Sequence, residues 1–270
     1  MEIDEIRDKW SLKQKNKQAS VAMWNSMAGS FAEFELPNFR EDSLLKLLEN
    51  NKMLNSAGKA LDVGCGAGRY ALALAERFQS VIALDLAPQM IEIANKKKVE
   101  LNIENVDFIC EDWHQLDIEQ AGYKHEFALV FAHMTPAVQS ADTFEKLSAA
   151  SKGWCVLSKP IRRTDPVSDA VKELVGVREK REGCDEELLY AFELLWRQGY
   201  LPKLEYEKQA WKMKKTPDEA YGLYINRIKT YRDISAAEEE RIKAYLNSLA
   251  GDGFIYENVE TTIATIFWHV

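Results

Sequence analysis

Residues 60–69 read Ala-Leu-Asp-Val-Gly-Cys-Gly-Ala-Gly-Arg, and this stretch decides the fold expected of the chain. Its apolar start predicts a short buried strand, and the apolar spacing of residues 70–78 predicts a helix directly after it. Glycines in the turn between the two let a ligand approach the backbone closely. Because backbone N–H groups at a helix N-terminus attract polar ligand atoms, the stretch predicts a nucleotide-binding loop.

The spacing of the glycines distinguishes two kinds of nucleotide site. A dinucleotide site needs the pattern G-x-G-x-x-G. Here Arg69 stands where that pattern needs its third glycine, and the third glycine comes one residue earlier, at Gly68. The loop, preceded by Asp62, resembles the first motif of class I S-adenosylmethionine-dependent methyltransferases. An acid suits the ammonium group of that cofactor and would repel a pyrophosphate.

The resemblance implies a cofactor and the residues that hold it. S-adenosylmethionine has an adenosine, a sulfonium and an amino acid end, and it has no phosphate. The strand and the loop would place these residues against it: Asp62, Gly64, Cys65, Gly66 and Gly68.

The order of patterns along the chain predicts the fold. Strand and helix signals alternate over residues 38–161, which favours a parallel sheet with crossover helices. A sixth strand at 204–213 and a final strand at 261–270 complete the seven-stranded sheet that the resemblance implies, with helical insertions at 165–199 and 216–250. We therefore expect an α/β, Rossmann-like three-layer sandwich with a mostly parallel sheet. Its parts are lid helices (1–37), the cofactor-binding core (38–161), and substrate-lid helices with the last two strands (162–270).

Composition limits the possible partners. The chain has 270 residues and a formal net charge of −8, which disfavours a broad nucleic-acid-binding face. We find no signal peptide and no apolar run of about 18 residues, and so expect a cytoplasmic protein with no membrane partner. Cys65, Cys110, Cys155 and Cys184 lack the spacing of zinc ligands, so we predict mostly buried, reduced thiols and no metal.

Asp85 ends the predicted second strand, 21 residues after Gly64. An acid about 20 residues beyond the glycines can accept hydrogen bonds from both ribose hydroxyls. The alternative is a carboxylate that only caps the following helix. In the same region Leu86 and Met90 are expected to pack on the adenine, although a methionine on a helix is more often a core residue.

Asp112 and Trp113 follow the predicted third strand. In the family that the loop resembles, an acid here often bonds the adenine amino group, and the next residue offers its backbone N–H to the ring. The alternative is a turn with a local cap, for which Asp is a common residue.

His133 ends the predicted fourth strand, in the sequence Val-Phe-Ala-His-Met-Thr-Pro. Ligands of open α/β sheets lie beyond the carboxyl ends of the strands, so this turn should face the transferred methyl group. His133 is a candidate general base, since its ordinary pKa lets it take a proton near neutral pH. A lid contact or a helix cap are the alternatives. The Asn-Pro-Pro-aromatic and Pro-Cys motifs of base-methylating relatives are absent.

Residues 24–34 resemble the lead-in helix that closes over the cofactor in many small-molecule methyltransferases. Trp24 or Phe31 near the sulfonium would attract it through the ring quadrupole. An amphipathic helix that simply docks on the sheet is the alternative. Further along, Arg162 and Arg163 could hold an acidic substrate group, although such pairs usually remain exposed.

These features predict a methyltransferase that acts on a small molecule and releases S-adenosylhomocysteine. The alternatives are methylation of RNA or protein, and a regulatory protein that binds the cofactor without catalysis. The sequence carries no signal for the identity of the acceptor, the methylated atom or the oligomeric state.

Overall fold

The computed structural model describes residues 1–11, 16–177 and 182–270. The side chain of Cys184, predicted to be a free thiol, lies outside the described part. Within these residues seven strands form one sheet in the order β3-β2-β1-β4-β5-β7-β6. Their bounds are β1 Lys59–Val63, β2 Ser80–Asp85, β3 Val106–Cys110, β4 Phe127–His133, β5 Ser151–Thr164, β6 Lys203–Lys215 and β7 Ile255–His269.

The directions of the strands confirm the predicted Rossmann-like sheet. Strands β1 to β5 pair in parallel. Strand β7 lies antiparallel between β5 and β6. Parallel neighbours need crossover connections, and helices supply them on both faces of the sheet.

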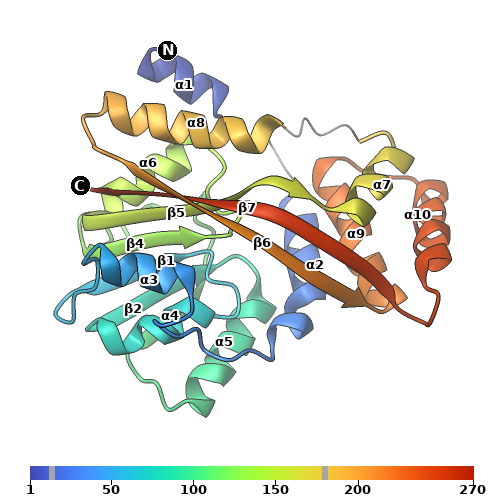
Figure 1. Cartoon of the computed structure of the whole chain (residues 1–270), viewed down its shortest axis with the longest axis horizontal. Helices are drawn as coiled ribbons and strands as arrows, with labels where there is room; N and C mark the ends of the chain where they lie inside the picture. Colours follow the sequence, from blue (N-terminus) through green and yellow to red (C-terminus); the bar gives the residue numbers. More distant parts are fainter. Residues whose placement is uncertain (12–15, 178–181) are drawn as a thin grey trace.

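The helices cover the sheet in two layers and form a third group at its far end (Figure 1). Helices α1, α6 and α8 contribute to the core on one face, and α3 and α4 to the core on the other. The bounds are α1 Ile3–Lys9, α2 Lys17–Met27, α3 Ser43–Asn50, α4 Arg69–Leu74, α5 Pro88–Glu100, α6 Ala141–Ala150, α7 Pro166–Leu174, α8 Glu182–Arg197, α9 Pro217–Tyr231 and α10 Ala236–Leu249, with 3₁₀ turns η1 Ala28–Phe31 and η2 Ala75–Arg77.

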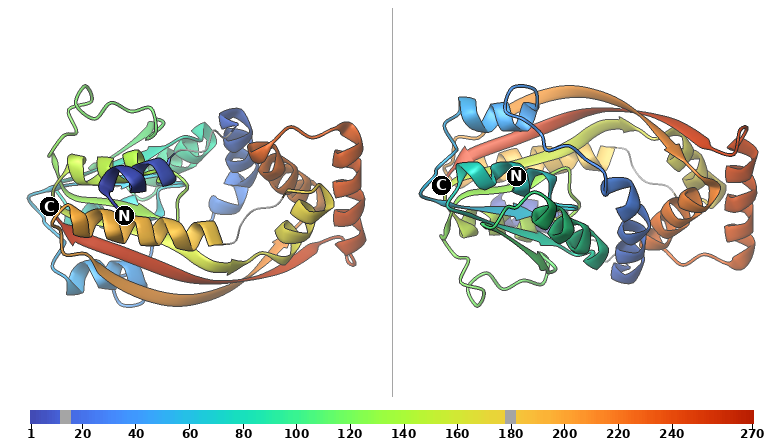
Figure 2. Two further views of the ribbon diagram at one scale, coloured as in Figure 1. Left: turned by 90° about the horizontal axis from the view of Figure 1, so that it is seen from above. Right: turned by 90° about the horizontal axis from the view of Figure 1, so that it is seen from below.

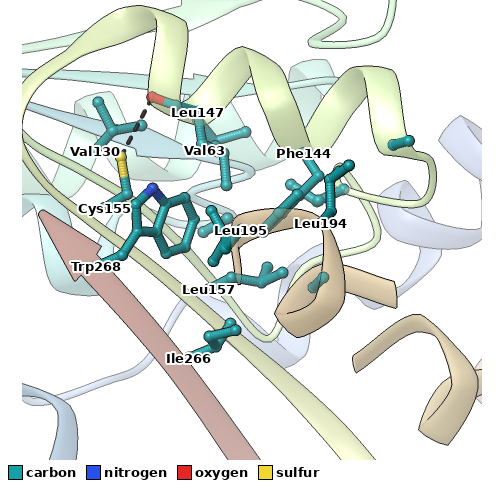
Figure 3. Close-up of a cluster of buried hydrophobic side chains, with 14 of the residues drawn as sticks. Val63, Val130, Phe144, Leu147, Cys155, Leu157, Leu194, Leu195, Ile266 and Trp268 are labelled. Carbon is teal, nitrogen blue, oxygen red and sulfur yellow. Dashed lines mark hydrogen bonds between the residues drawn. The ribbon is translucent and has the colours of Figure 1, made fainter. Parts of the chain in front are cut away.

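The core between the sheet, α6 and α8 is apolar and closely packed (Figure 3). Trp268 of β7 lies against Phe144 of α6, with ring centroids 5.1 Å apart. Cys155 donates its thiol to the carbonyl of Leu147, and burial raises its pKa to about 12. That thiol is therefore inert, as expected, whereas Cys110 is exposed and the prediction of burial was wrong for it.

Strands β5 and β7 are longer than predicted, because their distal halves are buried on one face only. Along β7 the residues from Ile255 to Thr261 alternate between buried and exposed, so charged residues interrupt the apolar run that predicts a buried strand. The buried face packs against α7, α9 and α10 in a separate apolar cluster. We call these three helices with the distal halves of β5, β6 and β7 the distal module (Figure 1).

Helix α2 lies between the sheet and the distal module, as both views of Figure 2 show. It packs closely on α9, since a Cβ at Gly222 would come within 3.0 Å of the Cβ of Ser26. No helix in the described residues is long and apolar enough to span a bilayer.

Candidate functional site

The glycine loop lies at the carboxyl end of β1, against the turn that follows β4. Gly64 has φ of +75°, and a Cβ there would lie 1.9 Å from Oγ1 of Thr135, so only glycine fits. Gly66 has φ of +54° and faces open space, because a Cβ there would meet nothing within 4 Å. The backbone is therefore accessible to a ligand beside Gly66.

Four N–H groups of the loop are already used within the protein. The N–H groups of Gly64 and Cys65 both donate to the carbonyl of Leu84, at 2.8 and 2.9 Å. That of Gly66 donates to Oδ2 of Asp85 at 2.8 Å, and that of Gly68 donates to the carbonyl of Cys65 at 3.0 Å. The expectation of free donors was wrong at these positions, because the loop folds back onto the end of β2. The N–H groups at these four positions are therefore not free to bind an anion.

Two carboxylates lie beside this loop. Burial and then the charge of Asp85 hold the pKa of Asp62 well above its ordinary value, against a backbone hydrogen bond from Ala71. Burial also raises the pKa of Asp85, although the N–H groups of Ala87 and Gly66 oppose the rise. Two acids that are costly to ionise gain from a nearby cation and from hydroxyl donors. These two acceptors fit the ammonium group and the ribose hydroxyls of S-adenosylmethionine, which donate hydrogen bonds.

Asp112 and Trp113 separate in the structure. Asp112 is buried at the end of β3, and its Oδ2 lies 2.7 Å from Nζ of Lys17 on α2. Trp113 packs its side chain into the core, where Nε1 donates to the carbonyl of Thr143 at 2.9 Å. Adenine contacts from Asp112 and from the backbone of Trp113 remain predictions. The sequence analysis did not identify Lys17 as the partner of Asp112, because Lys17 lies 95 residues earlier in the chain and no local pattern connects the two.

Of the two aromatic residues predicted in the lead-in segment 24–34, one lies near the glycine loop. Trp24 is partly buried against a cluster that joins Ala67 of the loop to Ala87 and Met90 after β2. Phe31 is 40% exposed. The structure therefore brings Trp24 and Met90 to the edge of the site, with Leu86 half-buried beside them. Contact of Trp24 or Phe31 with a sulfonium stays a prediction.

His133 ends β4 next to Tyr70, the second residue of α4. The two rings meet edge to face, with centroids 4.7 Å apart, and the Tyr70 hydroxyl donates to Oδ2 of Asp42 at 3.0 Å. Burial lowers the pKa of His133 to about 4, although Asp42 and Glu207 oppose the shift. Nδ1 of His133 is buried and has no hydrogen-bond partner among the described residues. The ring is therefore neutral at pH 7 and offers an unused polar atom.

We expect His133 to make the protein sensitive to mild acid. The pKa of about 4 in the folded chain lies below the ordinary value of 6.5, so the unfolded chain takes the proton first as the pH falls. Stability that is present above pH 6.5 should then be lost progressively towards pH 4, by about 2 kcal/mol at pH 5. Urea unfolding at pH 7 and pH 5 should show a smaller loss in a His133→Gln variant. Equal losses in both proteins would contradict a buried, neutral ring.

Two other features of the described residues lie outside this site. A surface groove of about 1120 Å³ runs along the segment from Leu36 to Glu41 and η2, away from the carboxyl ends of the strands. No three His, Cys, Asp or Glu side chains in the described ranges gather as metal ligands would.

Comparison with known families and structures identifies the core. A family model described as a methyltransferase domain matches residues 60–152. The structure of a candidate methyltransferase from Bacillus halodurans superposes with a TM-score of 0.50 at 18% identity, covering 84% of this chain and 99% of that one. The identity is low, so this likeness concerns the fold.

Two curated relatives match part of the chain. The 2-heptyl-1-hydroxyquinolin-4(1H)-one methyltransferase of Mycobacteroides abscessus is 39% identical over 72 residues, which is 27% of this chain and 30% of the relative. The ubiquinone biosynthesis O-methyltransferase of Xanthomonas axonopodis is 37% identical over 70 residues, or 26% of this chain and 29% of the relative. The matches thus span less than a third of either relative's length.

Residues 60–152 match a methyltransferase domain, and the sheet that they help to form has the Rossmann-like strand order. The match begins at β1 and ends near the start of β5, so it includes neither the distal module nor any part of α2.

Proposed function

We propose that the protein transfers a methyl group from S-adenosylmethionine to a small-molecule acceptor and releases S-adenosylhomocysteine. One observation carries the proposal: the glycine loop, the buried Asp62, the half-buried Asp85 and His133 lie at the carboxyl ends of the neighbouring strands β1, β2 and β4, in the region that matches a methyltransferase domain. Both relatives described above are named for small-molecule chemistry, which supports the acceptor class.

Within this proposal each part of the site has a task. When bound, S-adenosylmethionine supplies an activated methyl group. Asp85 orients the ribose hydroxyls. Asp62 and the carbonyl oxygens of the glycine loop hold the ammonium group at the amino acid end of the cofactor. Helix α2, with Trp24, keeps water out of the site. Much of the rate then comes from holding the acceptor in line with the methyl group.

His133 acts here as a hydrogen-bond acceptor that orients the nucleophile. A ring with a pKa of about 4 takes up a proton poorly at neutral pH, so it is a weak general base. Its Nδ1 has no hydrogen-bond partner among the described residues, and in the tautomer with the proton on Nε2 its lone pair accepts a hydrogen bond from the nucleophile.

Titration of the purified chain with S-adenosylmethionine tests whether the protein binds this cofactor, which the proposal and its alternatives all require. NAD is the matched control. We expect saturable binding of S-adenosylmethionine and none of NAD. The reverse result would overturn the proposal. Incubation of methyl-labelled donor with separate small-metabolite, RNA and protein fractions then identifies the acceptor class. Label in the small-metabolite fraction supports the proposal, and label elsewhere, or binding without any transfer, favours an alternative.

Replacing His133 with alanine should lower kcat by about tenfold to a hundredfold, because the acceptor loses its positioning contact. Affinity for S-adenosylmethionine should stay within threefold of the parent. His269→Ala is the control, since His269 is exposed near the chain's end. Unchanged turnover in His133→Ala would remove the residue from the catalytic site.

A further inference from the structure

A group of charged side chains lies inside the distal module, away from the glycine loop. Arg163 forms a two-point ion pair with Asp165, at 2.7 and 3.0 Å. Arg227 of α9 lies 4.0 Å from the same carboxylate and donates to Oγ of Ser168 at 3.0 Å. Lys215 of β6 is influenced by the charges of Arg227 and Asp165, so these groups form one cluster.

The carboxylate of Glu257 is the second acid of this cluster, and its hydrogen bonds are filled. Its Oε1 accepts from the N–H of Val167 at 2.9 Å, and its Oε2 accepts from the hydroxyl of Tyr224 at 2.5 Å. Glu257 is 4% exposed. Arg163, Arg227 and Lys215 thus face the carboxylates of Asp165 and Glu257, and the charge of Glu219 also acts on Lys215.

Lys215 is the group that this network leaves incomplete. Its side chain is buried, and its Nζ lies 3.8 Å from Oε2 of Glu257, beyond hydrogen-bond distance. Nζ has no hydrogen-bond partner among the described residues. A buried ammonium without acceptors is costly, and an anion would satisfy its three N–H groups.

Strand β5 connects the methyltransferase site to this cluster. Ser158 pairs with His133 at the end of β4, and Arg163 follows five residues later along β5. At about 3.3 Å per residue, the cluster is roughly 15 Å beyond His133. The left-handed backbone of Arg162, with φ of +50°, interrupts the pairing of β5, and the guanidinium of Arg163 lies 5.4 Å from the Trp211 ring.

Two of the cations remain accessible. The side chains of Arg163 and Arg227 are 28% and 22% exposed, so a ligand at the surface of the module can reach the cluster. A bound anionic group would form charge-assisted hydrogen bonds with these cations and would give the Lys215 ammonium the acceptors that it lacks among the described residues.

We propose that Lys215, Arg227 and Arg163 bind an acidic group, a carboxylate or a phosphate, at the end of the methyl acceptor remote from the methylated atom. This inference rests on the proposed function for its link to methyl transfer. The acceptor is then an elongated anion whose reactive end lies at His133.

Anion binding is tested with inorganic phosphate and with acetate, by thermal unfolding of the full chain at constant ionic strength. We expect a saturable rise in Tm with at least one anion. In a Lys215→Met variant the apparent affinity should fall at least tenfold. In the matched control Lys212→Met, an exposed lysine on the same strand, it should stay within twofold.

Each Tm shift is measured against the same variant in chloride, and S-adenosylmethionine is titrated in parallel. Loss of anion binding with cofactor binding retained supports the proposal. If Lys215→Met does not fold, Arg227→Gln replaces it with the same expected loss. No saturable response in the parent, or equal responses in parent and variant, would reduce the cluster to an internal ion-pair network.

After transfer of labelled methyl groups to metabolites, the labelled product should bind an anion exchanger, and an uncharged product would overturn the acceptor assignment.

Discussion

Replacing Asp85 with asparagine is expected to weaken S-adenosylmethionine binding about a hundredfold while the fold stays intact. Both carboxylate oxygens already accept backbone N–H groups, from Ala87 and Gly66 at 2.8 Å each, and each retains a lone pair for a ribose hydroxyl. Asparagine keeps one acceptor and turns an amide N–H towards the other donor. Hydrogen bonds to charged groups are worth about 1.5–3 kcal/mol each, and about 2.7 kcal/mol corresponds to a hundredfold change.

The stability of this variant separates a binding defect from a folding defect. Burial raises the pKa of Asp85, so its favourable contribution is complete below an ordinary pKa of 3.8 and is lost as the pH rises through the folded value. At pH 7 the ionised group opposes folding, and relief of that cost offsets the backbone hydrogen bond that asparagine loses, so Asp85→Asn should unfold at a temperature close to that of the parent. Asp107→Asn on β3 is the control, with a side chain that is 75% exposed. Titration calorimetry that finds affinity within threefold of the parent would contradict the ribose role.

The sequence predicted the cofactor half of the molecule because its signals are local. The glycine spacing, the strand-end Asp85 and the short apolar strands each lie within a few residues of the feature they predict. Strand β3 ends at Cys110, two residues before Asp112, as the predicted third strand does. The helix α6 was missed, although Ser140 and Thr143 form a capping box at its start, because Thr at this position is weaker than the usual Glu or Gln.

The acceptor half was less predictable because its contacts join distant segments. Tyr70 meets His133 and Asp42 only after β1, β4 and α3 are in place, and no spacing in the sequence marks them as neighbours. Arg163 was expected either to hold an acidic substrate group or to remain exposed, and in the structure it is ion-paired with Asp165 and borders Trp211 of β6. Contacts of this kind between strands are determined by the register in which β5, β7 and β6 pair, which the local sequence does not indicate.

Glu257→Gln should destabilise the protein by about 3–5 kcal/mol, the usual cost of leaving one member of a buried ion pair without its partner. Glu257 joins three elements of the distal module, since it accepts from Val167 of α7 and Tyr224 of α9 and neutralises Lys215 of β6. Glutamine preserves the shape but removes the charge, and the Lys215 ammonium then remains buried and uncompensated. Urea unfolding at pH 7 measures the loss.

A double variant shows whether the cost comes from this pair. Adding Lys215→Met to Glu257→Gln removes the uncompensated charge, so the double variant should recover at least 1 kcal/mol relative to Glu257→Gln alone. Glu260→Gln is the control, because Glu260 is exposed on the same strand and should change stability by less than about 0.5 kcal/mol. If Glu257→Gln costs less than about 1 kcal/mol, or if the two substitutions are additive, Lys215 does not depend on Glu257. The ammonium would then be satisfied by water, and the case for an anion at Lys215 would weaken with it.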